Sequence, residues 1–231
     1  MSTHQEGELA RRNGDGRFAV LSSERPFAGK IVTVRVDEVA MPGGTSARRE
    51  VVEHLRAVAV VPLDEAGRVV MIEQYRHPLR RRLWELPAGL MDLDGEPPAE
   101  CAARELVEEA GLVAARWSVL VDLASSPGFC TEAIRVYLAR ELRSVPTPPQ
   151  RDEEADLRVV RVPLDDAVTA VLDGRIVNAT AVAGLLAAAR VLSAGSDRVL
   201  RDADDPWTTG PATVNTEPGI GAAAALAAAA E

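Results

Sequence analysis

The sequence has 231 residues, of which 47% are hydrophobic and 26% are charged, and its formal net charge at pH 7 is −9. These proportions exclude a chain that is disordered or fibrous throughout. No apolar run reaches the roughly 18–20 residues of a membrane span, and the polar start lacks a secretory signal. The acidic balance argues against nucleic-acid binding. The spacing of the two cysteines is typical neither of a disulfide framework nor of a zinc site, so we expect reduced thiols in the cytoplasm. Together these features predict a protein without membrane or nucleic-acid partners.

Strand-like segments come first in the chain. Residues 1–16 are polar and are expected to form a disordered tail. Residues 17–50 contain the alternating run KIVTVRVDEVAM and the turn sequence MPGGTSARR, after which strand character resumes in EVVEHLRAVAVVPL. A strand, a tight turn and a strand predict a hairpin, so residues 17–50 are expected to form an N-terminal antiparallel β-segment.

The main domain is expected over residues 51–195. EAGRVVMIEQYR, WSVLVDLASSPG, AIRVYLARELR and LRVVRVPL have strand character, whereas CAARELVEEAGL, LDDAVTAVLDGRI and NATAVAGLLAAARVLSAG have helical periodicity. Strands before and after a central helix predict an α/β or α+β sandwich. Residues 196–231 are rich in Asp, Pro, Thr, Gly and Ala without an amphipathic pattern, and a second disordered tail is expected there.

Three acidic residues are clustered in the central helix. Glu105, Glu108 and Glu109 have the spacing i, i+3 and i+4, which places three carboxylates on one helix face. Like charges at this spacing repel by roughly 0.2–0.5 kcal/mol per pair, unless a hard cation such as Mg²⁺ takes them as oxygen ligands. Taken alone, the pattern is more typical of a solvated acidic face. We also expect Arg104 to tie Glu96, near the helix start, to the helix.

The residues around these acids resemble the signature of Nudix hydrolases: a Gly, a spacer, Glu, seven residues, Arg-Glu, an aliphatic residue, any residue, Glu-Glu, any residue, Gly and an aliphatic residue. The chain matches this signature at nine positions: Gly89, Glu96, Arg104, Glu105, Leu106, Glu108, Glu109, Gly111 and Leu112. Six residues, rather than the usual five, separate Gly89 from Glu96. The extra residue falls in the loop before the helix, so the acidic face keeps its spacing.

The resemblance implies a fold of the α/β class, namely an α/β/α sandwich with a mixed sheet. It also implies that the protein hydrolyses a nucleoside diphosphate linked to another group. By matched position, Glu105 and Glu109 would be the main Mg²⁺ ligands and Glu108 an auxiliary one. The main-chain carbonyl of Ala88 would complete the set, and Mn²⁺ is an alternative cation. Such cations neutralise the diphosphate and orient a water.

Features outside this motif are similar to the bacterial ADP-ribose pyrophosphatases of actinobacterial type, over nearly two-thirds of the chain. Pro127 follows Gly111 by sixteen residues, a spacing seen in many such enzymes. The segment EQYR places Arg76 where these enzymes hold the phosphates or the adenine side of the substrate. By the same resemblance, Arg49 would contact substrate from the other subunit of a domain-swapped homodimer. Glu132 would lie near the adenine or the terminal ribose.

The resemblance also implies a catalytic acid-base in a loop after the core strands. Glu153 and Glu154 are the candidates in the segment RDEEAD, and the alignment favours Glu154. Glu108 is the next candidate among the glutamates of the motif. An acidic loop flanked by proline is otherwise typical of an exposed linker, whereas a base on a closing loop would exclude water once substrate is bound.

Hydrolysis of ADP-ribose to AMP and ribose 5-phosphate is therefore the favoured function. Among enzymes, the alternative is another Nudix activity, on a nucleotide sugar, NADH or an oxidised nucleotide. Outside enzymes, the alternative is a Nudix ligand sensor, but this chain retains its three clustered glutamates and shows no helix-turn-helix pattern. The sequence leaves open the group attached to ADP, the preferred cation and the phosphorus that is attacked.

Overall fold

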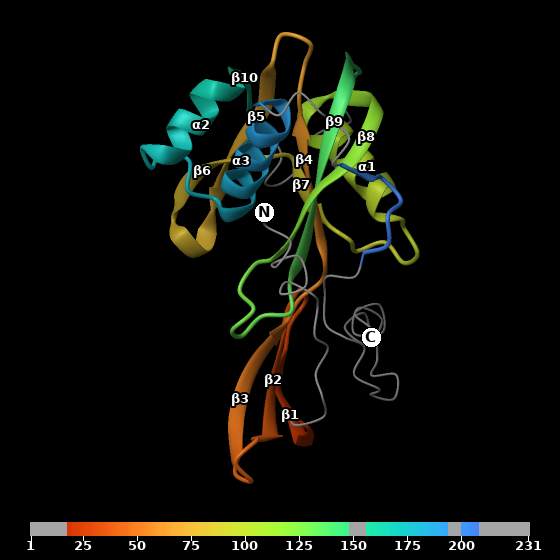
Figure 1. The fold of residues 1–231 in the computed structure, drawn as a ribbon. Helices are drawn as coiled ribbons and strands as arrows, with labels where there is room; N and C mark the ends of the chain where they lie inside the picture. Colours follow the sequence, from red (N-terminus) through yellow and green to blue (C-terminus); the bar gives the residue numbers. More distant parts are fainter. Residues whose placement is uncertain (1–17, 148–155, 194–199, 208–231) are drawn as a thin grey trace, which may run out of the picture. The chain divides into compact units, whose positions relative to one another are not determined.

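The computed structural model describes residues 18–147, 156–193 and 200–207. The chain forms two compact units that divide between Glu53 and His54, three residues beyond the division expected from the sequence (Figure 1). The predicted tail over residues 1–16 lies outside the described residues. Within the described part of the chain, no helix is long and apolar enough to cross a membrane.

The N-terminal unit is a three-stranded antiparallel sheet in the order β1-β2-β3. Its strands are β1 (Val20–Ala28), β2 (Thr33–Ala40) and β3 (Ser46–Glu53). The predicted hairpin is confirmed as β2 and β3, whose turn contains Gly44 with the left-handed φ of 79° that favours glycine. β1 is an additional strand that was not predicted separately. Only Asp37 is buried among the described residues of this unit, so the sheet has no apolar core of its own.

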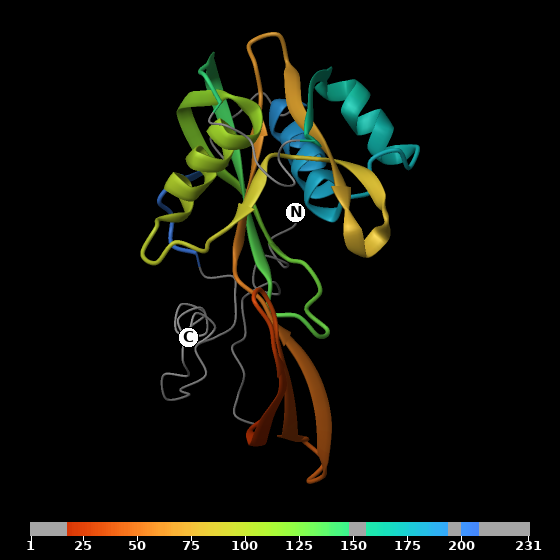
Figure 2. The ribbon, with the colours of Figure 1, turned by 180° about the vertical axis from the view of Figure 1, so that it is seen from behind.

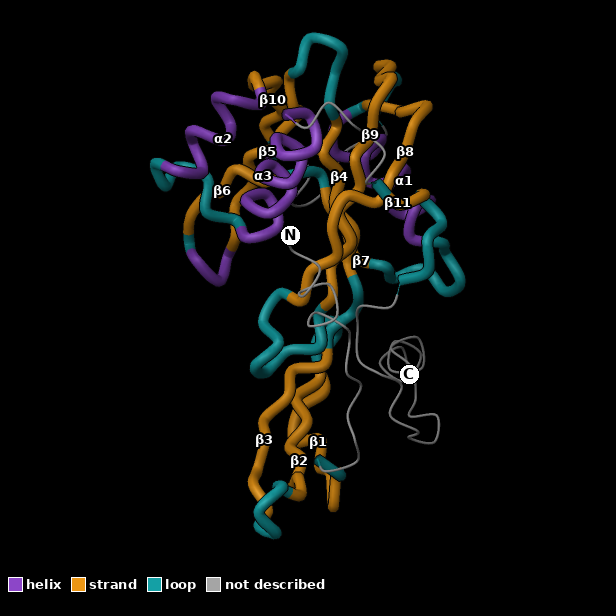
Figure 3. The backbone as a smooth tube through the Cα atoms, in the orientation of Figure 1, coloured by secondary structure: helices purple, strands orange, loops and turns teal. Residues whose placement is uncertain are grey.

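The described residues of the second unit form two sheets (Figure 3). A mixed sheet has the order β11-β8-β9-β4-β7 and consists of β4 (Ala57–Pro62), β7 (Ala88–Leu90), β8 (Leu112–Ala124), β9 (Ala133–Ser144) and β11 (Arg201–Asp202). In it β4 and β9 run parallel, and the other neighbours are antiparallel. A smaller antiparallel sheet has the order β10-β5-β6 and consists of β5 (Arg68–Arg76), β6 (Arg81–Glu85) and β10 (Arg158–Pro163). The 3₁₀-helix η1 (His77–Leu79) joins β5 to β6.

In the described part of the chain, three α-helices cover these sheets: α1 (Pro98–Ala110), α2 (Leu164–Leu172) and α3 (Ala179–Ser193). Helix α1 lies on one face of the mixed sheet, and α3 lies on the other face beside α2 (Figures 1 and 2). Val58 and Val60 of β4 pack in the apolar cluster of α1, whereas Ala59 and Val61 pack in that of α3. β4 is therefore buried on both faces, which explains its uninterrupted apolar sequence. The α/β/α sandwich with a mixed sheet is confirmed.

The run EVVEHLRAVAVVPL does not form one strand. It is divided between β3 of the N-terminal unit and β4 of the second unit, and the break falls at residues 54–56. At the break, the main-chain N–H of His54 donates to the hydroxyl of Thr131 over 3.0 Å instead of to a neighbouring strand. A side chain 77 positions away in the sequence thus ends the strand, and hydrophobic alternation alone could not indicate it.

The segment of residues 200–207 corrects the expectation of a disordered tail from residue 196. It contains β11, which pairs with β8, and its Ala203 and Trp207 pack against the apolar cluster of α1. The Trp207 ring lies 5.2 Å from the guanidinium carbon of Arg56 and 5.1 Å from that of Arg135. Cation–π contacts and one aromatic side chain therefore dock a segment whose composition is mostly polar. The rest of the predicted tail lies outside the described residues.

Asp122 anchors this C-terminal segment through two arginines. Arg135 donates to Asp122 over 2.8 and 3.1 Å, and Arg201 donates to it over 2.8 Å. Arg135 is only 1% exposed and also donates to the main-chain oxygen of Asp205. Burial alone would raise the pKa of Asp122, but the hydrogen bonds from both arginines outweigh it and the pKa is lowered. A buried charged network therefore joins β8, β9 and the C-terminal segment.

Asp122→Asn should lower the free energy of unfolding by about 3 kcal/mol at pH 7, because it leaves the Arg135 guanidinium buried without a charged partner. The folded-state pKa of Asp122 lies below its unfolded value. Its stabilisation is therefore present at neutral pH and is lost as the pH falls through the lowered pKa. Urea titrations at pH 7 and in acid should show the difference from wild type shrinking with acidity. The exposed Asp202 is the matched control, and an Asp122→Asn loss no larger than that of Asp202→Asn would contradict the assignment.

Candidate active site

Helix α1 positions the glutamates of the matched motif. It begins after Pro97, with Pro98 in the first turn, where a missing N–H loses no helical hydrogen bond. It ends at Gly111, whose φ of 62° is left-handed. Its apolar side packs into the core, and Glu105 and Glu109, which are 9% and 7% exposed, lie beside β7. The helix covers most of the segment CAARELVEEAGL, for which helical periodicity was predicted.

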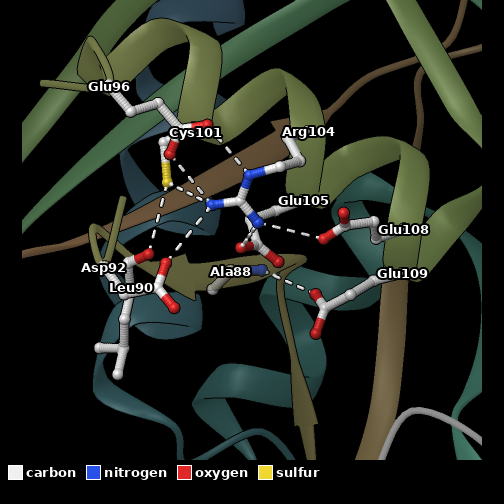
Figure 4. Close-up of polar contacts among 9 residues, drawn as sticks. All are labelled: Ala88, Leu90, Asp92, Glu96, Cys101, Arg104, Glu105, Glu108 and Glu109. Carbon is white, nitrogen blue, oxygen red and sulfur yellow. Dashed lines mark hydrogen bonds and ion pairs between the residues drawn. The ribbon is translucent and has the colours of Figure 1, made fainter. Parts of the chain in front are cut away.

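Arg104 lies at the centre of the polar contacts shown in Figure 4. Its Nε and Nη2 donate to the two carboxylate oxygens of Glu96, each over 3.0 Å, which confirms the predicted link between the loop and the helix. Its Nη1 donates to Glu105 over 2.7 Å and to Glu108 over 3.1 Å. The hydrogen bonds from Arg104 hold the pKa of Glu96 below its ordinary value. One guanidinium therefore compensates three carboxylates and ties down the loop before the helix.

Glu109 points toward Ala88 of β7 (Figure 4). Its Oε2 accepts a hydrogen bond of 2.8 Å from the main-chain N–H of Ala88. Burial raises the pKa of Glu109 to about 8; the Ala88 N–H lowers it in part, and the charge of Glu105 raises it further. Burial also raises the pKa of Glu105, although Arg104 opposes the effect. Glu105 and Glu109 are thus a buried acidic pair with too little positive charge around them.

Gly89 of β7 allows the Glu105 side chain to pass close to this strand. A Cβ atom at position 89 would lie 2.1 Å from the Cδ of Glu105. Any other residue would therefore displace the carboxylate, which gives a physical reason for the glycine that begins the matched motif. The extra loop residue falls between β7 and α1 and leaves the Arg104–Glu96 link intact.

The donor set at α1 fits a hard divalent cation. Mg²⁺ prefers carboxylate oxygens, and its charge would offset the burial and repulsion that raise the pKa values of Glu105 and Glu109. Among residues 18–147, 156–193 and 200–207, no three His, Cys, Asp or Glu side chains are already arranged around one metal position. Glu108 instead pairs with Arg104. The fit therefore rests on Glu105 and Glu109, with the main chain of Ala88 beside them.

Arg76, at the end of β5, lies near this acidic pair. Burial is the main cause of the raised pKa of Glu109, whereas the positive charge of Arg76 lowers that pKa. The Arg76 guanidinium forms a two-point ion pair with Glu85 of β6, over 2.9 and 2.7 Å. Glu85 was not among the predicted site residues. Glu85 is the one acidic residue in the otherwise uncharged run LWELPAGL, and this feature could have identified it.

Pro127 and Glu132 belong to the loop between β8 and β9. The N–H groups of Phe129 and Cys130 donate to the main-chain oxygen of Ser126, which forms a turn around Pro127. The Oε1 atom of Glu132 is 3.5 Å from Nδ1 of His54, the first residue of the second unit. Glu132 therefore pairs with a histidine that the sequence did not single out.

Three predicted site residues remain: Arg49, Glu153 and Glu154. Arg49 lies on the exposed part of β3, in the other compact unit, where its Nη1 donates to the main-chain oxygen of Arg48 over 2.9 Å. Glu153 and Glu154 lie outside the described residues. The structure thus gathers Ala88, Glu105, Glu108, Glu109 and Arg76 into one region.

Comparisons with known proteins identify the family of the chain. Residues 53–183 match the family model described as NUDIX domain. The ADP-ribose pyrophosphatase of Mycobacterium tuberculosis is 50% identical over 194 residues, which are 84% of this chain and 93% of the relative. A methanol dehydrogenase activator of Bacillus methanolicus is 36% identical, over 70% of this chain and 87% of the relative. The crystal structure of an ADP compounds hydrolase has a TM-score of 0.69 and 22% identity, over 78% of this chain and 96% of that one, and shares the fold.

Mg²⁺ should stabilise the folded chain, because a cation that binds only the folded state shifts unfolding by mass action. The expected gain is about 2.7 kcal/mol at about 100 times its dissociation constant. Glu109→Gln should remove most of the rise in melting temperature, since it keeps the side-chain shape but deletes a charged ligand. The exposed Glu100, in the first turn of the same helix, provides the control. If Glu109→Gln and Glu100→Gln respond to Mg²⁺ equally, Glu109 is not a ligand.

Proposed function

Because the chain belongs to the Nudix family, we propose that it is an enzyme that hydrolyses the diphosphate bond of ADP-ribose with Mg²⁺, giving AMP and ribose 5-phosphate. The observation that carries the proposal is the buried pair of Glu105 and Glu109 beside Arg76. Two buried carboxylates next to a guanidinium provide a place for a cation and for the anion that it neutralises. The name and the 50% identity of the mycobacterial relative support ADP-ribose as the substrate.

Each part of the proposed reaction has a candidate residue. Glu105 and Glu109 would hold the Mg²⁺, which when bound neutralises diphosphate charge and orients a water. Arg76 would hold phosphate oxygens with its planar, charged donors. Glu154, or otherwise Glu153, would accept a proton from the attacking water as its oxygen bonds to phosphorus. The bond between that phosphorus and the bridging oxygen then breaks, and the bridging oxygen leaves on the other product.

The loop of Pro127 and Glu132 is proposed to hold the adenine or the terminal ribose. Its turn at Ser126 and the approach of Glu132 to His54 support a defined loop conformation. A carboxylate held in place can accept hydrogen bonds from ribose hydroxyls or from the amino group of adenine. Glu132 would therefore contribute to substrate selection rather than to bond cleavage.

We also propose that the enzyme is a homodimer in the cytoplasm. The N-terminal sheet buries only Asp37 among its described residues, and it exposes Val20, Leu21 and Phe27. A three-stranded sheet needs an apolar partner for stability, and a second copy of the chain would provide one. Both cysteines are free thiols, which supports a reducing compartment.

A substrate panel tests the proposed activity. ADP-ribose, a nucleotide sugar, NADH and an oxidised nucleotide would each be incubated with Mg²⁺ or Mn²⁺, and the products identified by mass. ADP-ribose should give the highest kcat/KM. Running the reaction in ¹⁸O-water shows which phosphorus is attacked, because the label enters the product that receives the water. Faster hydrolysis of another compound would reassign the substrate, and no hydrolysis would reject the proposal.

Glu154→Gln should lower kcat by about 10²–10⁴-fold, because a general base acts in the transition state. KM should change far less, since Arg76 and the cation hold the substrate in both states. Glu153→Gln makes the same charge change at the neighbouring position and is the control. A large loss in Glu153→Gln instead would transfer the role to Glu153. If both variants keep kcat, neither residue is the base, and Glu108 is tested next.

Mixing inactive variants tests whether Arg49 acts across a dimer. Arg49→Ala and Glu109→Gln subunits should be inactive separately, but a mixed dimer would contain one site with both residues intact. Random pairing should restore about a quarter of wild-type activity if subunits are swapped. Arg76→Ala mixed with Glu109→Gln should restore none, because both residues belong to one subunit's site. No recovery with Arg49→Ala, or a fully active monomer in sedimentation, would contradict the swap.

A further inference from the structure

The ion pair of Arg76 and Glu85 is fixed by two hydrogen bonds. Arg76 donates from Nε to one carboxylate oxygen of Glu85 over 2.9 Å, and from Nη2 to the other over 2.7 Å. This geometry fixes the plane of the guanidinium and the direction of its Nη1 end. The two partners differ in exposure: the Glu85 side chain is 3% exposed, whereas that of Arg76 is 40% exposed. A buried carboxylate therefore holds an arginine that solvent can reach.

The pairing of β5 with β6 places both residues on the α1 side of the small sheet. Glu85 lies opposite Ile72, which is four positions before Arg76, so Ile72, Arg76 and Glu85 share one face. Val70, on the same face of β5, packs in the cluster of α1, whereas Met71 packs in the cluster of α3. Four residues of strand span about 13 Å. The Arg76 side chain must therefore extend back along the strand to reach Glu85.

The pair also lies close to the buried glutamates of α1. Burial has the largest effect on the raised pKa of Glu109, and among the nearby charges Arg76 lowers that pKa while Glu85 raises it. Both charges therefore act on a carboxylate of the candidate metal site. A diphosphate held at that site would lie within reach of the Arg76 guanidinium.

We propose that Glu85 is a positioning residue that orients the Arg76 guanidinium for the substrate's diphosphate, so that substrate affinity depends on the pair and not on Arg76 alone. This inference rests on the proposed function of the same site. An arginine has many rotamers, and fixing it before the substrate arrives removes an entropic penalty from binding. The opposite role would be electrostatic: a carboxylate that only neutralises Arg76 would weaken its attraction for phosphate.

Kinetics of Glu85→Gln distinguish these roles, because they shift KM in opposite directions. The amide can accept only one of the two hydrogen bonds from Arg76. If Glu85 positions Arg76, KM for ADP-ribose should rise about tenfold with kcat within about threefold of wild type. If Glu85 only neutralises Arg76, KM should fall, and that result would overturn the inference. Glu73→Gln, on the opposite face of the same sheet, is the matched control and should leave both constants unchanged.

A double-mutant cycle shows whether Glu85 acts through Arg76. In an Arg76→Ala background, Glu85→Gln should raise KM no further, because the side chain to be oriented is absent. An additional tenfold increase in that background would mean that Glu85 acts independently, and would overturn the inference. Glu85→Asp keeps the charge but is one methylene shorter, so its KM should lie between those of wild type and Glu85→Gln. Should Glu85→Gln fail to fold, an unchanged KM in Glu85→Asp would count against positioning.

Calorimetric binding of inorganic pyrophosphate with Mg²⁺ separates this inference from the proposed substrate. Pyrophosphate lacks sugar and base, so it reports the diphosphate site whichever nucleotide is hydrolysed. Glu85→Gln and Arg76→Ala should each weaken its binding about tenfold, and the double variant no more than either alone. Absence of ADP-ribose hydrolysis by wild type would reject the proposed function, while this titration would still test Glu85. Equal binding by wild type and Glu85→Gln would overturn the role of Glu85.

Discussion

Charge compensation by Arg104 determines where the negative charge of α1 remains unbalanced. This one guanidinium donates to Glu96, Glu105 and Glu108, and it also ties the preceding loop to the helix. Glu109 instead accepts a hydrogen bond from the main-chain N–H of Ala88. Because Glu109 is buried, its pKa rises to about 8. A cation between α1 and β7 would favour the charged form of Glu109 and so offset the burial that raises its pKa.

The layered core brings this charge to a defined position. β7 is bonded to the doubly buried β4, and α1 packs on the same side of the mixed sheet, so the separation of Ala88 and Glu109 is set by core packing. Gly89 then permits Glu105 to approach the strand more closely than any side chain would allow. The precision of the acidic pair thus depends on apolar contacts and on one missing Cβ atom rather than on the glutamates themselves.

Local periodicity accounts for what could be predicted from the sequence. The helical character of α1, the shared face of its glutamates and the Arg104–Glu96 link depend on residues within a few turns of one another, and the structure agrees with them. The Arg76–Glu85 pair depends instead on the register of β5 with β6. The docking of residues 200–207 depends on Asp122, 79 positions before Arg201. Contacts of this kind leave no local pattern, and short strands such as β7 and β11 have too few residues to show alternation.

Arg76, Arg104 and Arg135 each hold a carboxylate through Nε and Nη2, but the three pairs serve different roles. Arg135 with Asp122 and Arg104 with Glu96 join separate segments, and Arg135 is almost completely buried. Displacing Asp122 would leave the buried Arg135 guanidinium without its charged partner, and displacing Glu96 would release the loop that Arg104 ties to α1, so these pairs are suited to stability. Arg76 differs, because its partner is buried while its own side chain is 40% exposed. An incoming anion can therefore reach Arg76 without breaking its ion pair with the buried Glu85. In the proposed reaction, the geometry that stabilises the fold at Arg104 and Arg135 thus serves to bind the diphosphate at Arg76.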